Sequence, residues 1–261
     1  MNNRCMFFFD FDDTLYSHVT NSVSNCTQRL LIELSEQGHI LVIASGRGRE
    51  AIELFNKELK YVPDTLVLLN GQIIYQGGEI AYANHITLMD VNDLFDIARN
   101  LNYAYGGHYW DGVIANQYTE RVKNVWTDFG SPIPFICDKF EDQYPIYQAH
   151  LYITKEEQYL FEGQIENYIT NWSHKYLVNL IHKSAGKSKA VNWCIDKYGI
   201  SRENTYAFGD GFNDVDMIET VAHGIAMGNA YERLKEKAEF ITKSASEDGI
   251  YYALKYYGFV E

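Results

Sequence analysis

Two carboxylates spaced two residues apart, Asp10 and Asp12, are the first residues in the chain that could do chemistry. They directly follow the apolar run 6–9, which predicts a short strand buried on both faces of a sheet. In an open parallel sheet, ligands bind just beyond the carboxyl ends of the strands. Asp10 and Asp12 are therefore candidates for the centre of a site. The competing interpretation is a surface turn with solvated acids.

Three further groups of polar residues stand at comparable places in the pattern, after an apolar run or at the start of a helix. They are Ser45 after the run 39–44, Lys187 just behind Gly186, and Asp210, Asn213 and Asp214 after the run 205–208. If the runs are neighbouring parallel strands, all of these side chains meet at one edge of the sheet.

Such a cluster predicts a divalent cation and a phosphorylated ligand. Asp10 and Asp210 are hard oxygen donors, which suit Mg²⁺ together with a substrate phosphate. Lys187 could offset the remaining negative charge. A candidate phosphate-binding turn near a helix start is made by the Ser45 hydroxyl and the backbone N–H groups of Gly46 and Arg47.

Each of these residues also has a simpler interpretation. Alone, Lys187 would be a solvated lysine at a helix start, and Arg47 would be a surface charge. Asp214 could be an ordinary N-cap acid of the helix that follows it, a role that does not exclude a second one.

The elements that must position these residues alternate between apolar runs and helical patterns in both terminal parts of the chain. This alternation predicts right-handed crossovers and an α/β protein with a parallel sheet. From about Asn84 to Lys183 the pattern changes to short aromatic runs broken by Gly and Pro, which predicts a separate inserted α+β unit. Within it, Thr154 and Glu157 form a capping box that predicts a helix carrying Phe161 through Ile169.

Composition restricts the class of partner and the compartment. A formal charge of −13 over 261 residues argues against nucleic acid and anionic membranes as primary partners. The four cysteines are scattered without a C-x-x-C pair, which is typical of reduced thiols. The sequence has neither a signal-peptide pattern nor an apolar stretch long enough to span a membrane, so we expect a cytoplasmic protein. Its oligomeric state is not predicted.

Taken together, these motifs resemble the haloacid dehalogenase superfamily of aspartate-nucleophile phosphatases, and within it the Cof-type sugar-phosphatase subfamily, class IIB. The matching segments are DFDDT at 10–14, ASGR at 44–47, Lys187 within AGKSKAV, GDGFND at 209–214 and AMGNA at 226–230. The resemblance implies a Rossmann-like catalytic core made of residues 1–83 and 184–261. It also implies that residues 84–183 form an inserted cap that closes over the substrate and sets specificity.

The resemblance further implies a role for each matching residue. Asp10 would attack phosphorus and form an aspartyl-phosphate, and Asp12 would protonate the leaving oxygen and then activate water. Mg²⁺ would be held by the carboxylates of Asp10 and Asp210 and by the backbone carbonyl of Asp12. The remaining implied roles belong to Ser45 and Lys187 on the phosphoryl group, Asn213 nearby, and Asp214 on the metal through water or as a support for Lys187.

The expected function is therefore Mg²⁺-dependent hydrolysis of small phosphorylated metabolites, such as sugar phosphates. The alternatives are a phosphomutase of the same superfamily and a metabolite-binding protein on an inactive phosphatase scaffold. One residue departs from the subfamily pattern: Asp13 stands where the subfamily commonly has Gly, which adds a negative group near the site. The physiological substrate is not predicted.

Overall fold

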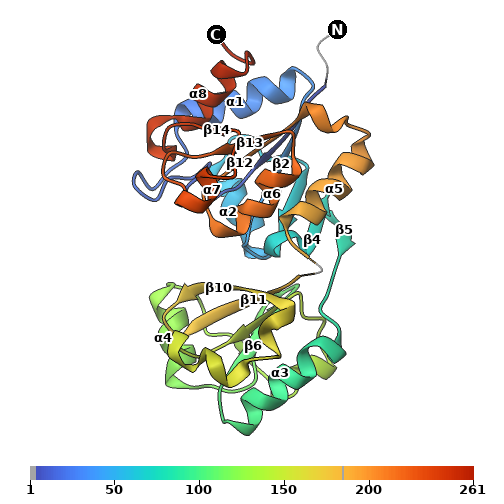
Figure 1. Cartoon of the computed structure of the whole chain (residues 1–261), viewed down its shortest axis with the longest axis vertical. Coiled ribbons are helices and arrows are strands. Elements are labelled where there is room, and N and C mark those ends of the chain that lie inside the picture. Colours follow the sequence, from blue (N-terminus) through green and yellow to red (C-terminus); the bar gives the residue numbers. More distant parts are fainter. Residues whose placement is uncertain (1–3, 184) are drawn as a thin grey trace. The chain divides into compact units, whose positions relative to one another are not determined.

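A computed structural model describes residues 4–183 and 185–261, which form two compact units (Figure 1). One unit comprises the chain up to Ala83 together with Gly186–Glu261, and the other is Asn84–Ala185. The predicted boundary at Ser184 itself lies outside the described residues.

The first unit is built on one eight-stranded sheet, in the order β14-β13-β12-β1-β2-β3-β4-β5. The strands from β14 to β3 are parallel, and β4 and β5 extend the sheet as an antiparallel hairpin. The strands are β1 Met6–Phe9, β2 Ile40–Ala44, β3 Thr65–Leu68, β4 Ile73–Gln76, β5 Glu79–Ala83, β12 Thr205–Gly209, β13 His223–Ala226 and β14 Phe240–Ile241. The α/β class and the parallel core predicted from the sequence are confirmed.

Helices cover both faces of this sheet, so β1 is buried along its whole length. Met6 and Phe8 pack into a core with α5 and α6, while Phe7 faces the other way and contacts Phe259. The helices are α1 Asn25–Glu36, α2 Glu50–Glu58, α5 Lys187–Tyr198, α6 Val215–Thr220, α7 Glu232–Lys235 and α8 Gly249–Tyr256. This double burial explains the uniformly apolar sequence of β1 and puts its polar continuation at the edge of the sheet.

The second unit has its own six-stranded sheet, in the order β10-β11-β9-β6-β7-β8. Its strands are antiparallel except for the short β7–β8 pair, and α3 packs against one face of the sheet through Leu94 and Phe95. Its elements are α3 Leu88–Asn100, β6 Tyr105–Tyr109, β7 Gly112–Ala115, α4 Glu120–Asp128, β8 Phe135–Ile136, β9 Gln148–Leu151, β10 Tyr168–His174 and β11 Leu177–His182.

The helix predicted after Thr154 is wrong, although its capping box is present. Instead of an α-helix, the chain forms two short 3₁₀ segments, Lys155–Phe161 and Ile165–Asn167, and then enters β10. Gly163, with a φ of 88°, interrupts the helical path between them. A capping box therefore marks where a helical turn begins but not how far it continues.

Glu157 offers a test of acid stability in this unit. Its carboxylate accepts two hydrogen bonds from Arg121, at 2.6 and 2.9 Å. The Arg121 guanidinium lowers the pKa of Glu157 to about 2, against an ordinary value of 4.5. Because the folded-state pKa is the lower one, the stabilisation is complete above pH 4.5 and is lost as the pH falls toward 2.

Replacing Glu157 by Gln keeps an acceptor for the Thr154 backbone N–H. The substitution should reduce the loss of stability in acid that comes from the Glu157 carboxylate. The unfolding midpoint of the variant should differ most from wild type above about pH 5 and converge with it in acid. Thermal unfolding measured against pH checks this, with Glu162→Gln as an exposed control on the same segment. A difference that stays constant with pH would contradict the assignment.

No helix in the described parts of the chain combines the length and apolarity needed to cross a bilayer.

Candidate active site

The predicted site residues of the first unit come together at the carboxyl ends of its central strands. Asp10 follows β1, and its backbone N–H donates to the carbonyl of Phe208 on β12 at 2.9 Å. Asp10 is 6% exposed. The alternative interpretation of solvated acids in a surface turn therefore does not hold for this residue.

Lys187 is the cation of the cluster. Its side chain is 0% exposed, and its Nζ donates to Asp10 Oδ1 at 2.6 Å and to Asp214 Oδ1. The lysine is therefore not a solvated helix-start residue. It bridges two carboxylates that lie far apart in the sequence.

A glycine pair explains how the backbone reaches this position. Gly186 has a φ of 123°, which favours glycine, and it leads directly into α5 at Lys187. The Gly186 carbonyl lies so close to Gly71 that a side chain at Gly71 would collide with it. The Ser188 N–H donates to Asp216 Oδ2 at 3.0 Å, which satisfies one free donor at the helix start.

Asp214 organises the loop after β12. One of its oxygens accepts from Lys187, and the other accepts from the backbone N–H groups of Asp210 and Gly211 at 3.0 and 2.8 Å. Asp214 is the N-cap residue of α6, but its side chain makes no capping bond to that helix. Its carboxylate is committed to the loop and the lysine.

The three carboxylates of Asp10, Asp210 and Asp214 each offer an oxygen within 4.8 Å of the others. Thr14, the last residue of the DFDDT motif, was given no role of its own from the sequence, and it donates from Oγ1 to Asp210 Oδ1 at 3.3 Å. Three acids share one lysine here, so the cluster carries excess negative charge. Grouped hard oxygen donors of this kind fit a divalent cation such as Mg²⁺.

The pKa values of the cluster reflect this excess of negative charge. Burial, followed by repulsion from Asp214, raises the pKa of Asp10 well above its usual range, and Lys187 offsets only part of this. Burial, Asp214 and Asp13 raise the pKa of Asp210 to about 7. Burial disfavours the charge on Lys187, but Asp10 and Asp214 outweigh it and raise the pKa of the lysine. A bound cation would relieve the repulsion between the acids.

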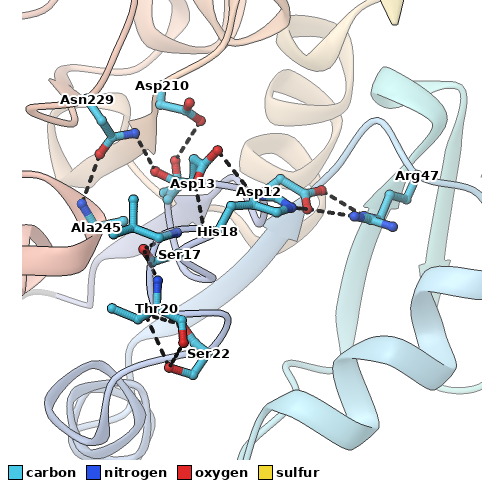
Figure 2. Close-up of polar contacts among 12 residues, drawn as sticks. Asp12, Asp13, Ser17, His18, Thr20, Ser22, Arg47, Asp210, Asn229 and Ala245 are labelled. Atoms are coloured by element: carbon cyan, nitrogen blue, oxygen red, sulfur yellow. Dashed lines mark hydrogen bonds and ion pairs between the residues drawn. The ribbon is translucent and has the colours of Figure 1, made fainter. Parts of the chain in front are cut away.

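Asp12 is not one of these three grouped acids, and its carboxylate pairs with Arg47. The Arg47 Nε and Nη2 groups donate to Asp12 Oδ2 and Oδ1, both at 2.7 Å (Figure 2). These hydrogen bonds raise the pKa of Arg47. The sequence predicted a role for the Arg47 backbone N–H in a phosphate-binding turn, and the structure adds that the Arg47 guanidinium binds Asp12.

Ser45 follows β2 and is 0% exposed. Its Oγ accepts from the backbone N–H of Arg47 at 3.1 Å. One of the N–H groups predicted to bind phosphate is therefore hydrogen-bonded within the turn itself. Gly46 lies against Asn70 and Asn213, and Asn213 Nδ2 donates to Asn70 Oδ1 at 2.9 Å. Sequence reasoning gave no role to Asn70, which follows β3.

Comparison with known proteins assigns the chain to a family. Residues 7–254 match the family model described as haloacid dehalogenase-like hydrolase. The chain belongs to the haloacid dehalogenase-like hydrolases. The resemblance to the Cof-type subfamily, class IIB, drawn from the sequence motifs, is confirmed by the family match and by solved relatives.

Three relatives indicate what this hydrolase is similar to. YkrA of Bacillus subtilis, which carries a provisional phosphatase name, is 31% identical over 98% of both chains. YcsE of Bacillus subtilis, named a 5-amino-6-(5-phospho-D-ribitylamino)uracil phosphatase, is 27% identical over 95% of this chain and 93% of its own. The solved subclass IIB sugar phosphatase BT4131 superimposes with a TM-score of 0.84 at 27% identity, covering 98% of this hydrolase and all of BT4131. The hydrolase is a phosphatase of this family.

Proposed function

We propose that this phosphatase hydrolyses phosphate monoesters of small metabolites with Mg²⁺, through transfer of the phosphoryl group to Asp10. The observation that carries the proposal is the buried Lys187, bound to Asp10 and Asp214, with Asp210 beside them. A buried lysine next to a carboxylate nucleophile can stabilise the negative charge of a phosphoryl group that enters the site.

The reaction has two steps, and Asp12 acts in both. An Asp10 carboxylate oxygen attacks phosphorus, the bond from phosphorus to the ester oxygen breaks, and Asp12 gives that oxygen a proton. Water then attacks the phosphorus of the aspartyl-phosphate while Asp12 takes its proton. The bond from phosphorus to Asp10 breaks, which releases inorganic phosphate and restores the Asp10 carboxylate and the protonated Asp12.

The other site residues hold the phosphoryl group and the cation. Asp10, Asp210 and the backbone carbonyl of Asp12 would hold Mg²⁺, with Asp214 supporting Lys187 or reaching the ion through water. When bound, the ion would neutralise charge on the phosphoryl oxygens. The phosphoryl-binding groups would be Ser45, Gly46, Arg47, Lys187 and Asn213.

Two contacts support a closer division of these proposed roles. Because the Ser45 Oγ accepts from the Arg47 N–H, its own hydroxyl proton remains available for a phosphoryl oxygen. The Arg47 guanidinium would act mainly by orienting Asp12, which it binds through two parallel hydrogen bonds.

The substrate is proposed by class only. We propose that the unit Asn84–Ala185 is the cap that selects among phosphorylated metabolites such as sugar phosphates or cofactor precursors. The names of the relatives support both classes, since one is a sugar phosphatase and another acts on a ribitylamino-uracil phosphate. A cytoplasmic location is supported by the four free cysteines.

A panel of phosphorylated metabolites, assayed with Mg²⁺ and scored by kcat/KM for released phosphate, tests the proposal. Release of inorganic phosphate from at least one metabolite or aryl phosphate is expected. An isomerised product formed only with a bisphosphorylated activator would show a phosphomutase. Tight binding of one metabolite with no turnover across the panel would show a binding protein instead.

Mg²⁺ should also stabilise the protein in a way that depends on pH. Asp210 has an ordinary pKa of 3.8 and a folded-state pKa of about 7, so the metal-free folded protein binds more protons than the unfolded chain between these values. Its stability therefore falls as the pH rises through that range. A bound cation removes this loss, so the increase in stability that the cation gives should be greater at about pH 7.5 than at about pH 5.

The measurement is the unfolding midpoint with and without Mg²⁺ at the two pH values. At a concentration of about 100 times Kd, the ion should add about 2.7 kcal/mol, or several degrees in midpoint. Asp210→Asn should abolish the shift, and Asp64→Asn, at an exposed site in the same unit, should keep it. An equal shift in wild type and Asp210→Asn would remove Asp210 from the metal site.

A further inference from the structure

We propose that His18, held in place by Asp13, is a positioning residue that orients the Asp12 carboxylate for proton transfer. The inference rests on the proposed function, because that function gives Asp12 its role as acid and base. It assigns a purpose to Asp13, the residue that stands where the subfamily commonly has Gly.

The backbone at Asp13 is in the left-handed region, with a φ of 54°. A glycine would adopt this conformation without steric cost, whereas an aspartate there is compensated by local hydrogen bonds of its side chain. The Asp13 N–H donates to the carbonyl of Tyr16 at 2.6 Å, and Asn229 Nδ2 donates to the Asp13 carbonyl at 2.8 Å. Since the backbone bonds would be open to glycine as well, the feature that requires aspartate is its carboxylate.

That carboxylate holds His18 at two points. The His18 backbone N–H donates to Asp13 Oδ1 at 2.9 Å, and the His18 Nδ1 lies 3.1 Å from Asp13 Oδ2. The edge of the His18 ring also meets Tyr16, with ring centroids 5.3 Å apart. Both the main chain and the imidazole of His18 are therefore fixed by the same loop, as Figure 2 shows.

With Nδ1 turned to Asp13, the opposite ring nitrogen faces Asp12. The His18 Nε2 lies 3.6 Å from Asp12 Oδ1, the oxygen that also accepts from Arg47 Nη2 at 2.7 Å. Arg47 binds both oxygens of the Asp12 carboxylate, and the His18 ring is a second basic group beside Oδ1. The Asp12 side chain is 33% exposed, so it is not fully enclosed by packing, and its two basic neighbours help to define its orientation.

Orientation matters for this residue because its proton must reach the ester oxygen as the bond to phosphorus breaks. Small displacements of a reacting group can cost about 10²-fold in rate. A poor leaving group, such as an alkoxide, needs the proton, whereas a nitrophenolate departs without it. Misplacing Asp12 should therefore slow alkyl phosphates much more than nitrophenyl phosphate, a selectivity that loss of loop stability alone would not produce.

The experiment measures kcat/KM with Mg²⁺ for an alkyl phosphate and for nitrophenyl phosphate in His18→Ala and Asp13→Gly. Both variants should lose about 10-fold or more on the alkyl ester and less than about twofold on the nitrophenyl ester. Asp12→Asn provides the reference and should show the same selectivity with a larger loss. Combining the two substitutions should add little to either alone, because both act through one contact.

His223→Ala is the matched control. His223 also pairs with an acid, since its Nδ1 lies 2.8 Å from Glu239 Oε2, but it lies on β13 outside the site. Its kcat/KM should match wild type on both esters. If His18→Ala fails to fold, Asp13→Gly decides the question, because glycine suits the backbone at that position.

Equal losses on the two esters, or no loss in either variant while Asp12→Asn remains selective, would overturn the positioning role and leave the proposed function intact. Failure of the wild-type protein to release phosphate from either ester and from the metabolite panel would instead overturn the proposed function and the inference with it.

Discussion

Replacing Asp10 by Asn is expected to lower kcat for phosphate release by about 10⁴-fold or more, the scale at which enzymes lose rate when a covalent nucleophile is removed. The substitution preserves the size of the side chain, and the Asp10 N–H can still bond to Phe208. An amide is a poor nucleophile and cannot carry the charge that Lys187 faces at 2.6 Å. The loss should therefore appear in kcat without unfolding the protein.

Steady-state kinetics with Mg²⁺ measures this, together with acid quenching of the enzyme during turnover. Wild type should trap a phosphate on protein that hydroxylamine releases, as an acyl phosphate requires, and Asp10→Asn should trap none. Asp64→Asn is the control for a surface Asp-to-Asn change. Near-wild-type turnover in Asp10→Asn would rule out Asp10 as the nucleophile.

Replacing Lys187 by Met is expected to affect both stability and activity. The substitution leaves the Asp10 and Asp214 carboxylates buried without their cation, and removing one partner of a buried ion pair costs about 3–5 kcal/mol. Turnover should also fall, by about 10²-fold or more, because a positive group facing the transferring phosphoryl is lost.

Denaturant unfolding compared with phosphate release separates the two effects. Lys189→Met, at an exposed position on the same helix, should change neither. Adding Asp214→Asn to Lys187→Met should restore part of the stability, since one unpaired charge is removed, but none of the activity. A Lys187→Met protein as stable as wild type would mean that the acids are already neutral without the lysine.

The residues that could be predicted from the sequence were those fixed by local pattern. Continuous apolar runs identified β1 and β2, and the Gly-Lys step placed Lys187 at the start of α5. The spacing of motifs after strands then predicted which side chains would meet, because parallel strands present their carboxyl ends at one edge.

What could not be predicted was the choice of partner among residues that the fold brings together. Arg47 has several acids within reach of its long side chain, and nothing in its neighbours along the chain shows that it binds Asp12. Asn70 contacts Asn213 across 143 positions of sequence. The prediction of a helix after Thr154 was wrong for a related reason. The capping box describes only the first turn and carries no information about Gly163 downstream.

The close approach of Gly71 and Gly186 has a consequence for exchanging modules between related proteins. Gly186 belongs to the first unit although it immediately follows the inserted one, and its carbonyl fits only against a residue without a side chain. A recombinant chimera that imports a foreign insert should therefore be spliced at Ala83 and Ala185, so that both Gly71 and Gly186 stay native. A donor segment that placed a residue other than glycine at position 186 would strain the backbone there, where φ is 123°, and would crowd the Asp216 carboxylate.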